Sequence, residues 1–432
     1  MNPTVNAYCT LAADSARQAA REAEAAQMRG EERPLLGVPV SIKDLTDTAG
    51  IRTTSGSPVF ANRVPAEDAL VVSRLKSAGA IVLGKTNTPE LGAGINTHNP
   101  LFGATRNPWD TSRGAGGSSG GAAAALAAGL CTLAEGSDHG GSLRIPASFC
   151  GIVALRTSPG RVPQYPGDWL YDPFSVTGPM ARSVADAALM LSVMAGPDDR
   201  VPISLPEPGA TFAQATEGDV RGLRVAWSRD LGVAAVDPEV AGVVEKAIDT
   251  WRSLGCVPEE ACPDFHEVPD MIPPLRAVRT AATYQSLVER GSVDNPFFQD
   301  FLELSRALGA LDVARAETQR SRLWENVERF FHQYDLLVTP ATQTAAFPIE
   351  EDYPKTIDGR TMNGTVEAIL LTYSISMTGL PAISIPCGFT AAGLPVGMQI
   401  VGRRHAEAAV LRAAAAFEAA TPLALRPRLT VG

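Results

Sequence analysis

The sequence predicts an α/β fold built on a mixed β-sheet, and two observations lead to this prediction. Short β-prone runs alternate with helical patterns along most of the 432 residues, an order that is typical of helices packed on a sheet. Hydrophobic residues make up 45% of the chain and charged residues 19%, which are the proportions of a globular protein with a large core. No internal repeat or low-complexity linker interrupts the pattern, so we expect one domain over 1–432.

The first part of the chain contains two helical patterns, each followed by a strand pattern. Residues 11–28 predict a helix and residues 35–42 a short interior strand that ends at Lys43. A second helix is predicted over 68–78 and a second strand over 80–83. Lys43 either marks the point where its strand reaches water or takes part in chemistry, and its position in the sequence leaves both interpretations open.

Residues 79–86, GAIVLGKT, match the phosphate-binding pattern of Gly, four residues and Gly-Lys-Thr. That pattern requires a flexible loop between a strand and a helix, whereas here its variable positions are the predicted strand. Pro89 also follows too closely for a helix to open at Lys85. Nucleotide binding is therefore not expected.

Residues 112–151 form the centre of the sequence, because two glycine-walled serine clusters bracket an alanine-rich run there. Ser118 and Ser119 lie in the first cluster and Ser142 in the second. The run 122–133 is small and apolar, which predicts a buried helix in close contact with its neighbours. The plain alternative is a turn, a core helix and another turn, since Gly and Ser are common turn residues.

The segment His139-Gly140-Gly141-Ser142 is interpreted as a nucleophile with its own oxyanion hole. Glycines beside a serine allow positive φ angles and let consecutive N–H groups point at one anion. A conventional nucleophile elbow is a weaker interpretation. The segment GGSSG at 116–120 matches the sequence pattern of the elbow, with Ser118 as nucleophile. However, the elbow needs a hydrophobic strand upstream, and the preceding segment is a polar loop. No His shares a motif with an acid, so a serine with a different base is favoured over a Ser-His-Asp triad.

The rest of the chain continues the alternation of strands and helices. After a strand that starts at residue 152, the aromatic residues of 165–174 fit either a pocket wall or local core. The remaining segments are a helix from about Ser183, a β-α-β unit over 222–262, helices over 270–333, strands at 336–339, 382–386 and 395–401, and a helix from about His405.

Charge and cysteine usage narrow the classes of function. The formal net charge is −10, without a run of Lys or Arg, which argues against nucleic acid or an anionic membrane as partner. The six cysteines are scattered, and no His stands at metal-ligand spacing, so we expect reduced thiols and no metal. Neither a signal peptide nor a membrane span is expected, and the cytoplasm is the default location.

A series of motifs runs in order over nearly the whole chain. The motifs are GVPVSIKD at 37–44, GKTNTPE at 84–90, NPLFGATRNPW at 99–109, GGSSGG at 116–121, GSDHGGSLRIPASFCG at 136–151, TGLPAISIPCG at 378–388 and GLPVGMQIVG at 393–402. This series resembles the amidase signature family. The resemblance implies amide hydrolysis without a cofactor, by a Ser-cisSer-Lys triad on a mixed sheet sandwiched between helices. Carried over by motif, the nucleophile is Ser142, the serine after a cis peptide is Ser118 and the lysine is Lys43.

The resemblance also implies how the triad works. Lys43 is a base only when neutral, so burial must lower its pKa from about 10.4 to near 7. It then takes a proton from Ser118, which takes one from Ser142. The N–H groups of His139, Gly140 and Gly141 are expected to hold the oxyanion, and the His139 imidazole is given no role.

Other residues near the motifs are expected to support the site. We expect Asp138 and Arg144 to form a salt bridge that braces the loop. Ser119 is expected to form a structural hydrogen bond. Gly92, Ala93 and Gly94 occupy positions where members of the family often line the acyl pocket, and their small size predicts room for a bulky or aromatic group.

Two departures from the family pattern bear on the function. The chain begins at NPTVNAY, which resembles an internal segment of the family, so we expect the leading helices usual in the family to be absent or truncated. This leaves dimer contacts open, with a homodimer as one option. In the A-type subunits of tRNA-dependent amidotransferases a glutamine usually stands where this chain has Ile145, which favours a stand-alone amidase. The alternatives are an amidotransferase component of that type, a carbamoyl-amide (urea-type) hydrolase, and a binding protein or different hydrolase.

Overall fold

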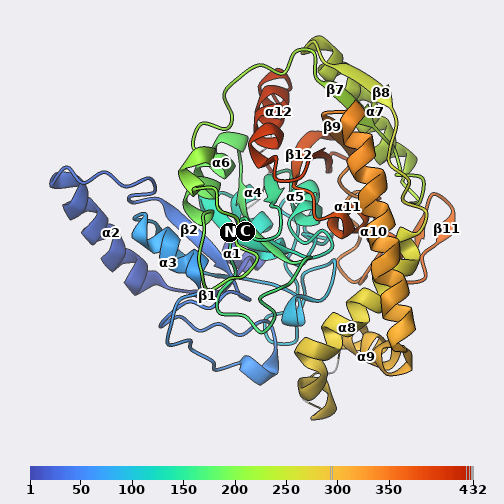
Figure 1. Cartoon of the computed structure of the whole chain (residues 1–432). Coiled ribbons are helices and arrows are strands. Elements are labelled where there is room, and N and C mark those ends of the chain that lie inside the picture. The colour runs from blue at the N-terminus through green and yellow to red at the C-terminus, as the bar shows by residue number, and fades with distance from the viewer. Residues whose placement is uncertain (292, 294, 425, 428, 430–432) are drawn as a thin grey trace.

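An eleven-stranded sheet runs through the molecule and is flanked by helices (Figure 1). The computed structural model describes residues 1–291, 293, 295–424, 426–427 and 429. In spatial order the strands are β1 (Tyr8–Leu11), β3 (Ile81–Thr86), β2 (Pro39–Lys43), β4 (Leu133–Asp138), β6 (Val176–Ala181), β5 (Val153–Arg156), β12 (Ala382–Phe389), β13 (Pro395–Gly402), β9 (Leu336–Pro340), β7 (Arg224–Trp227) and β8 (Val257–Glu260).

The sheet is mixed, which confirms the predicted fold class. Strand β2 pairs in parallel with β3 and β4, and β7 pairs in parallel with β8 and β9. The strands between these two groups pair antiparallel, from β4–β6 through β12–β13 to β13–β9. The parallel pairs β2–β3 and β2–β4 place the ends of β2 and β4 at the same edge, where Lys43 and Asp138 are the last strand residues.

Helices cover the sheet and also lie beside its two ends. Figure 1 shows α2 and α3 beside the N-terminal strands, and the long α10 with α8 and α9 at the opposite side. Among the described residues, none of the helices combines the length and apolar character needed to cross a bilayer. The helices are α1 (Asn2–Val5), α2 (Ala13–Met28), α3 (Leu70–Ser77), α4 (Gly120–Ala127), α5 (Arg144–Cys150), α6 (Val184–Met194), α7 (Pro238–Ser253), α8 (Val268–Glu289), α9 (Pro296–Ala307), α10 (Ala310–Gln333), α11 (Leu370–Thr378) and α12 (Glu407–Ala420). A small hairpin consists of β10 (Thr356–Ile357) and β11 (Arg360–Thr361).

The alanine-rich helix is shorter than predicted. Helix α4 ends at Ala127, Gly129 follows with φ 69°, and the chain re-enters the sheet as β4. The prediction of helix up to residue 133 was wrong because the small and apolar residues of 130–133 continue beyond Gly129, the turn at which the helix has already ended. The first predicted helix likewise includes Leu11, which belongs to β1.

The close packing expected of α4 is present, and it explains the small residues. A Cβ on Gly121 would lie 2.3 Å from the Asn87 nitrogen and 2.6 Å from the Ala7 oxygen. Only glycine fits such an approach of two backbones. Helix α4 is therefore fixed between the N-terminal segment and the end of β3, and it starts directly after the first serine cluster.

The strand β3 removes the phosphate-binding interpretation of 79–86. Three of its four variable positions and Lys85 lie in the strand, and Lys85 is completely buried. Its Nζ donates to Thr48 Oγ1 at 2.8 Å and to the carbonyl of Thr46. Burial lowers the pKa of Lys85 to about 8. The segment is thus part of the core and forms no loop around a phosphate.

Candidate active site

Lys43 reaches three serine hydroxyls from the end of β2. Its side chain is completely buried, and Nζ lies 2.8 Å from Ser118 Oγ, 2.9 Å from Ser119 Oγ and 3.0 Å from Ser137 Oγ. Sequence position had left open whether Lys43 reaches water. Burial removes that interpretation, because the amine is surrounded by the serine clusters.

Burial also determines the charge of this amine. Removal from water lowers the pKa of Lys43 to about 7, although the charges of Glu135 and Asp138 act in the opposite direction. Glu135 does not hydrogen-bond to Nζ. Its Oε2 accepts a hydrogen bond from the backbone N–H of Lys43 at 2.9 Å, and its Oε1 accepts one from Thr46 Oγ1 at 3.0 Å. Near neutral pH a large fraction of Lys43 is therefore unprotonated and able to accept a proton.

The two serine clusters meet through one backbone contact. The Gly117–Ser118 peptide bond is cis, as the family resemblance implies, and the Ser119 N–H donates to the Ser142 carbonyl at 3.2 Å. Ser142 is partly exposed, and its hydroxyl forms no hydrogen bond to any described residue. The clusters are thus held together, with the Ser142 hydroxyl left for an incoming group.

The expected oxyanion hole needs one correction, which concerns Gly141. The Gly141 N–H donates to Asp138 Oδ1 at 2.9 Å, so it is already occupied. By contrast, the N–H groups of His139, Gly140 and Ser142 have no hydrogen-bond partner in the part of the chain that the structure describes. Sequence reasoning counted adjacent N–H groups but had no means of seeing that a carboxylate lies under one of them.

The expected ion pair between Asp138 and Arg144 is present, and a second arginine joins it. Arg144 Nη2 lies 3.0 Å and Arg156 Nη1 lies 3.1 Å from Asp138 Oδ1, with all three side chains fully buried. Burial alone would raise the pKa of Asp138, but the two guanidinium groups outweigh burial and hold it well below its usual range. The carboxylate is therefore charged at neutral pH, and it fixes the loop by accepting the N–H groups of Gly141 and Leu143.

The His139 imidazole is held between two polar partners. Its Nδ1 lies 3.0 Å from Ser175 Oγ and its Nε2 lies 3.1 Å from the Tyr373 hydroxyl. Burial, helped by the charges of nearby arginines, lowers the pKa of His139 well below its usual value, so the ring is neutral. Phe174 of the aromatic loop packs edge-on against this ring, with centroids 5.7 Å apart.

A cavity of about 990 Å³ lies next to the serine clusters, and Ala93 and Gly94 line it as expected. A Cβ on Gly117 would lie 2.7 Å from the Gly94 oxygen, so the cavity begins directly beside the Ser118 segment. Gly92 does not face it. This residue, with φ 75°, packs against Leu45, to which a Cβ would come within 2.7 Å, and its role is to turn the chain.

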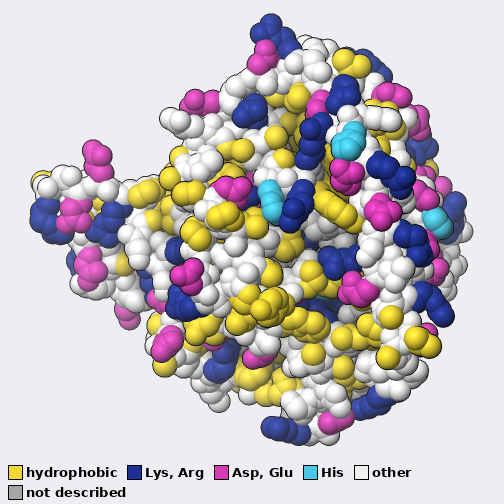
Figure 2. Space-filling view, in the orientation of Figure 1, with side chains coloured by type: hydrophobic (Ala, Val, Ile, Leu, Met, Phe, Trp, Pro, Cys, Tyr) yellow, Lys and Arg dark blue, Asp and Glu magenta, His cyan; other side chains and the backbone are white. Residues whose placement is uncertain are grey.

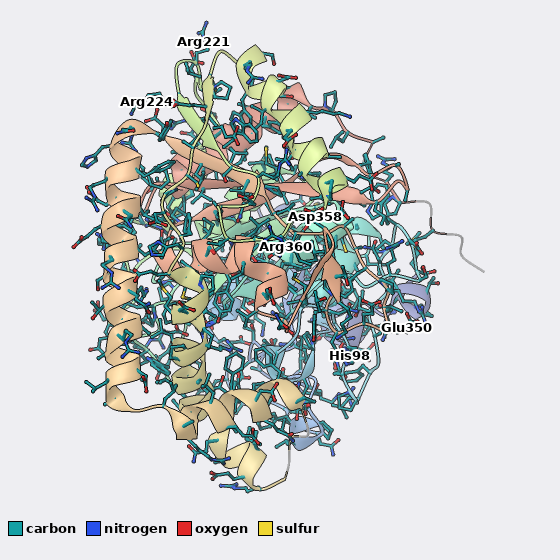
Figure 3. The ribbon with its side chains drawn as sticks, turned by 90° about the vertical axis from the view of Figure 1, so that its right-hand side faces the viewer. His98, Arg221, Arg224, Glu350, Asp358 and Arg360 are labelled. Carbon is teal, nitrogen blue, oxygen red and sulfur yellow. The ribbon has the colours of Figure 1, made fainter. Side chains whose placement is uncertain are left out.

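The walls of this cavity contain aromatic rings. Phe297, Phe301 and Tyr353 line it together with His98. Figure 3 shows His98 on the side of the molecule that carries Glu350 and the β10–β11 hairpin. The volume and the rings agree with the expected room for a bulky or aromatic group.

Several residues of the site were not predicted from the sequence. Ser137 and Glu135 lie on β4, which sequence reasoning missed, and Thr372 of α11 donates to the Gly140 carbonyl at 2.7 Å. The only sequence signal for Ser137 was its place in the GSDHGGS motif. Over the described residues, no group of three or more His, Cys, Asp and Glu side chains is arranged to hold a metal ion.

Comparison with known sequences gives consistent matches. The family model described as Amidase matches residues 1–411. An acylamidase of Rhodococcus erythropolis is 42% identical over 98% of this chain and 90% of its own length. The A-type subunit of the glutamyl-tRNA(Gln) amidotransferase of Moorella thermoacetica is 39% identical over 96% of this chain and 90% of its own length.

Comparison with solved structures gives the same result for the fold. A bacterial aryl acylamidase belonging to the amidase signature enzymes has a TM-score of 0.90 at 30% identity, over 98% of this chain and 90% of that chain. A 6-aminohexanoate cyclic dimer hydrolase complexed with substrate has a TM-score of 0.88 at 29% identity, over 99% and 92% of the two chains. The whole sheet, including the edge that carries Lys43, thus has close structural counterparts.

Asp138→Ala should destabilise the protein by about 3–5 kcal/mol, because it leaves Arg144 and Arg156 buried without a counter-ion. Urea unfolding followed by circular dichroism measures the loss. Asp14→Ala is a suitable control, because it removes a solvent-exposed ion pair with Arg17 and should cost less than about 1 kcal/mol. Equal midpoints for the two variants would contradict a bracing role for Asp138.

Proposed function

We propose that this chain, which belongs to the amidase signature family, hydrolyses carboxylic amides through an acyl-enzyme on Ser142. The observation that carries the proposal is the contact of 2.8 Å between the buried Lys43 amine and Ser118 Oγ. Family membership supports amide hydrolysis in general. The contact supports a particular way of moving the proton without a histidine.

The first step is a relay of two protons. Neutral Lys43 accepts the Ser118 proton while Ser118 accepts the proton of Ser142, and the Ser142 oxygen attacks the amide carbonyl. The unpartnered N–H groups in the 139–142 loop stabilise the oxyanion, and each such donor is worth about 10²-fold or more in rate.

In the second half of the reaction the relay gives its protons to the leaving amine and to Ser142. As the C–N bond breaks, the amine leaves with the proton that Lys43 had accepted, passed back through Ser118. Water then attacks the Ser142 ester while the same relay accepts its proton. As the C–O bond to Ser142 breaks, the relay returns that proton to the Ser142 oxygen, and the carboxylic acid product leaves and ionises in solution. The neutral His139 takes no proton in this scheme, since its pKa lies far below neutrality.

An A-type amidotransferase subunit is the second candidate, favoured by the 39% identity to one such protein. Ile145 supports the stand-alone enzyme instead. It is buried in an apolar cluster with Ile95, Phe149 and Phe347, where an isoleucine side chain packs without the cost of burying a polar group.

The purified chain alone should release ammonia or amine from simple amides at a rate that added amidotransferase partners do not increase. Aryl, aliphatic and peptide amides form the substrate panel, and ammonia or amine is measured directly. Heat-inactivated protein is the control. Activity that appears only with partner subunits would favour the transferase.

Lys43→Ala should lower the rate of acylation by about 10³-fold or more, because the relay loses its base. In the wild type kcat/KM should rise with pH through about 7, since the protonated amine present at lower pH cannot accept a proton. Stopped-flow acylation and a pH profile give both values. Lys246→Ala, an exposed lysine on α7, should leave them unchanged.

A Lys43→Ala protein with wild-type turnover and the same acidic limb would contradict the relay, provided that its circular dichroism spectrum is native. A histidine would then have to be considered as the base.

A fluorophosphonate should label Ser142, because this hydroxyl is the partly exposed end of the relay. Mass spectrometry of the digested protein identifies the modified peptide, and Ser142→Ala should take up no label. An adduct on Ser118 in the wild type would restore the nucleophile-elbow interpretation and refute the assignment of Ser142.

A further inference from the structure

Arg276 is a half-buried arginine on α8, and the one carboxylate whose charge reaches it, that of Asp172, forms no ion pair with it. It forms no ion pair with any residue of the described chain, and its Nε is enclosed without a hydrogen-bond partner. The guanidinium carbon lies 5.1 Å from the centre of the Phe297 ring. Because removing a charge from water is costly, an enclosed arginine is normally paired with an acid.

The arginines around Arg276 do have partners. Arg279 is paired with Asp172, whose charge also reaches Arg276 but whose carboxylate is thus already engaged. Arg320 Nε donates to the Met377 carbonyl at 3.0 Å. The Arg276 guanidinium interacts with the Tyr373 hydroxyl, but no described carboxylate serves as the bidentate acceptor that its planar fork is suited to bind.

The position of Arg276 connects it to the nucleophile loop. Its charge acts on both His139 and Tyr373, whose side chains are hydrogen-bonded to each other. A Cβ on Gly140 would lie 3.0 Å from the Tyr373 ring, so Tyr373 packs directly on the loop that leads to Ser142. Helices α8 and α11, which carry Arg276 and Tyr373, pack against each other, and Figure 2 shows Lys and Arg side chains on the face of the molecule that these helices share.

The electrostatic balance of this region is positive. Arg276, Arg279 and Arg156 all act on His139, and the available carboxylates of Asp172 and Asp138 are each paired with arginines. A neutral amide would leave this surplus charge uncompensated. A substrate that brings its own negative charge would neutralise it.

We propose that Arg276 binds a carboxylate of the substrate, so that the enzyme acts on amides that carry an anionic group. This inference rests on the proposed amidase function and adds the substrate class. The carboxylate stands either on the acyl part or on the amine part of the amide. Both placements share the same chemistry at Arg276, and the experiment separates them.

Two matched substrate pairs test the proposal. For the acyl part, glutaryl p-nitroanilide is compared with pentanoyl p-nitroanilide. For the amine part, the pentanoyl amide of 4-aminobenzoate is compared with pentanoyl anilide. In at least one pair the wild type should prefer the anionic member in kcat/KM by about 10- to 100-fold, the range of a charge-assisted hydrogen bond.

The variant Arg276→Met should lose this preference by slowing the anionic substrate alone, and Arg276→Lys should keep part of it. Arg290→Met, an exposed arginine after the end of the same helix, is the matched control and should behave as the wild type. The rate of fluorophosphonate labelling gives a second comparison without turnover. Pentanoate should protect Ser142 better than 1-pentanol in the wild type, and this difference should disappear in Arg276→Met.

The outcomes separate the two proposals. No preference for the anionic member in either pair, together with equal protection by pentanoate and 1-pentanol, would overturn the carboxylate site. Equal loss of rate on charged and neutral substrates in Arg276→Met would also overturn it, because that pattern indicates a structural role. Failure of fluorophosphonate to label Ser142 in the wild type would instead contradict the amidase mechanism.

Discussion

The removal of one amine from water is the constraint on which the site depends. Lys43 has hydroxyl groups around its Nζ and no direct carboxylate contact among the described residues. A carboxylate in hydrogen-bond contact would hold the proton on the amine and remove the base, as opposite charges favour the ionised form. Glu135 is close enough to influence the charge but uses its hydrogen bonds on the Lys43 backbone and on Thr46. The surroundings therefore favour a neutral amine and still fix its position.

The loop that carries the nucleophile is fixed by an ion-pair cluster, whereas Lys43 is positioned by hydroxyl groups. Asp138, charged and enclosed by two arginines, accepts backbone N–H groups from the loop. The same interaction that fixes the loop occupies one N–H that oxyanion binding was expected to use. Neighbouring N–H groups of this loop thus serve two purposes. The N–H of Gly141 stabilises the loop, and the unpartnered N–H groups on either side of Gly141 are left to stabilise the oxyanion.

Sequence reasoning predicted the fold class and the residues of the triad because both have local signatures. The alternation of strands and helices indicated a mixed sheet, and the glycine-walled serines lie in motifs. Sequence reasoning missed β4. Most of this strand is buried, but it contains the polar residues Glu135, Ser137 and Asp138 and therefore does not have the hydrophobic pattern of an interior strand. Sequence reasoning also had no means of finding Arg276 and Tyr373, because only the packing of α8 against α11 brings them to a loop more than a hundred residues earlier in the chain.

The burial of Lys43 and Lys85 also links folding to protons. In the folded chain their pKa values are lowered to about 7 and about 8, from 10.5 in the unfolded chain. Above pH 8 folding therefore releases protons from these amines, and a rise in pH favours the folded state until the unfolded amines also lose their protons. The buried thiols of Cys150 and Cys387 have raised pKa values and act in the opposite direction above about pH 9. The two buried lysines, which cost the fold stability at lower pH, therefore cost it least in mildly alkaline solution.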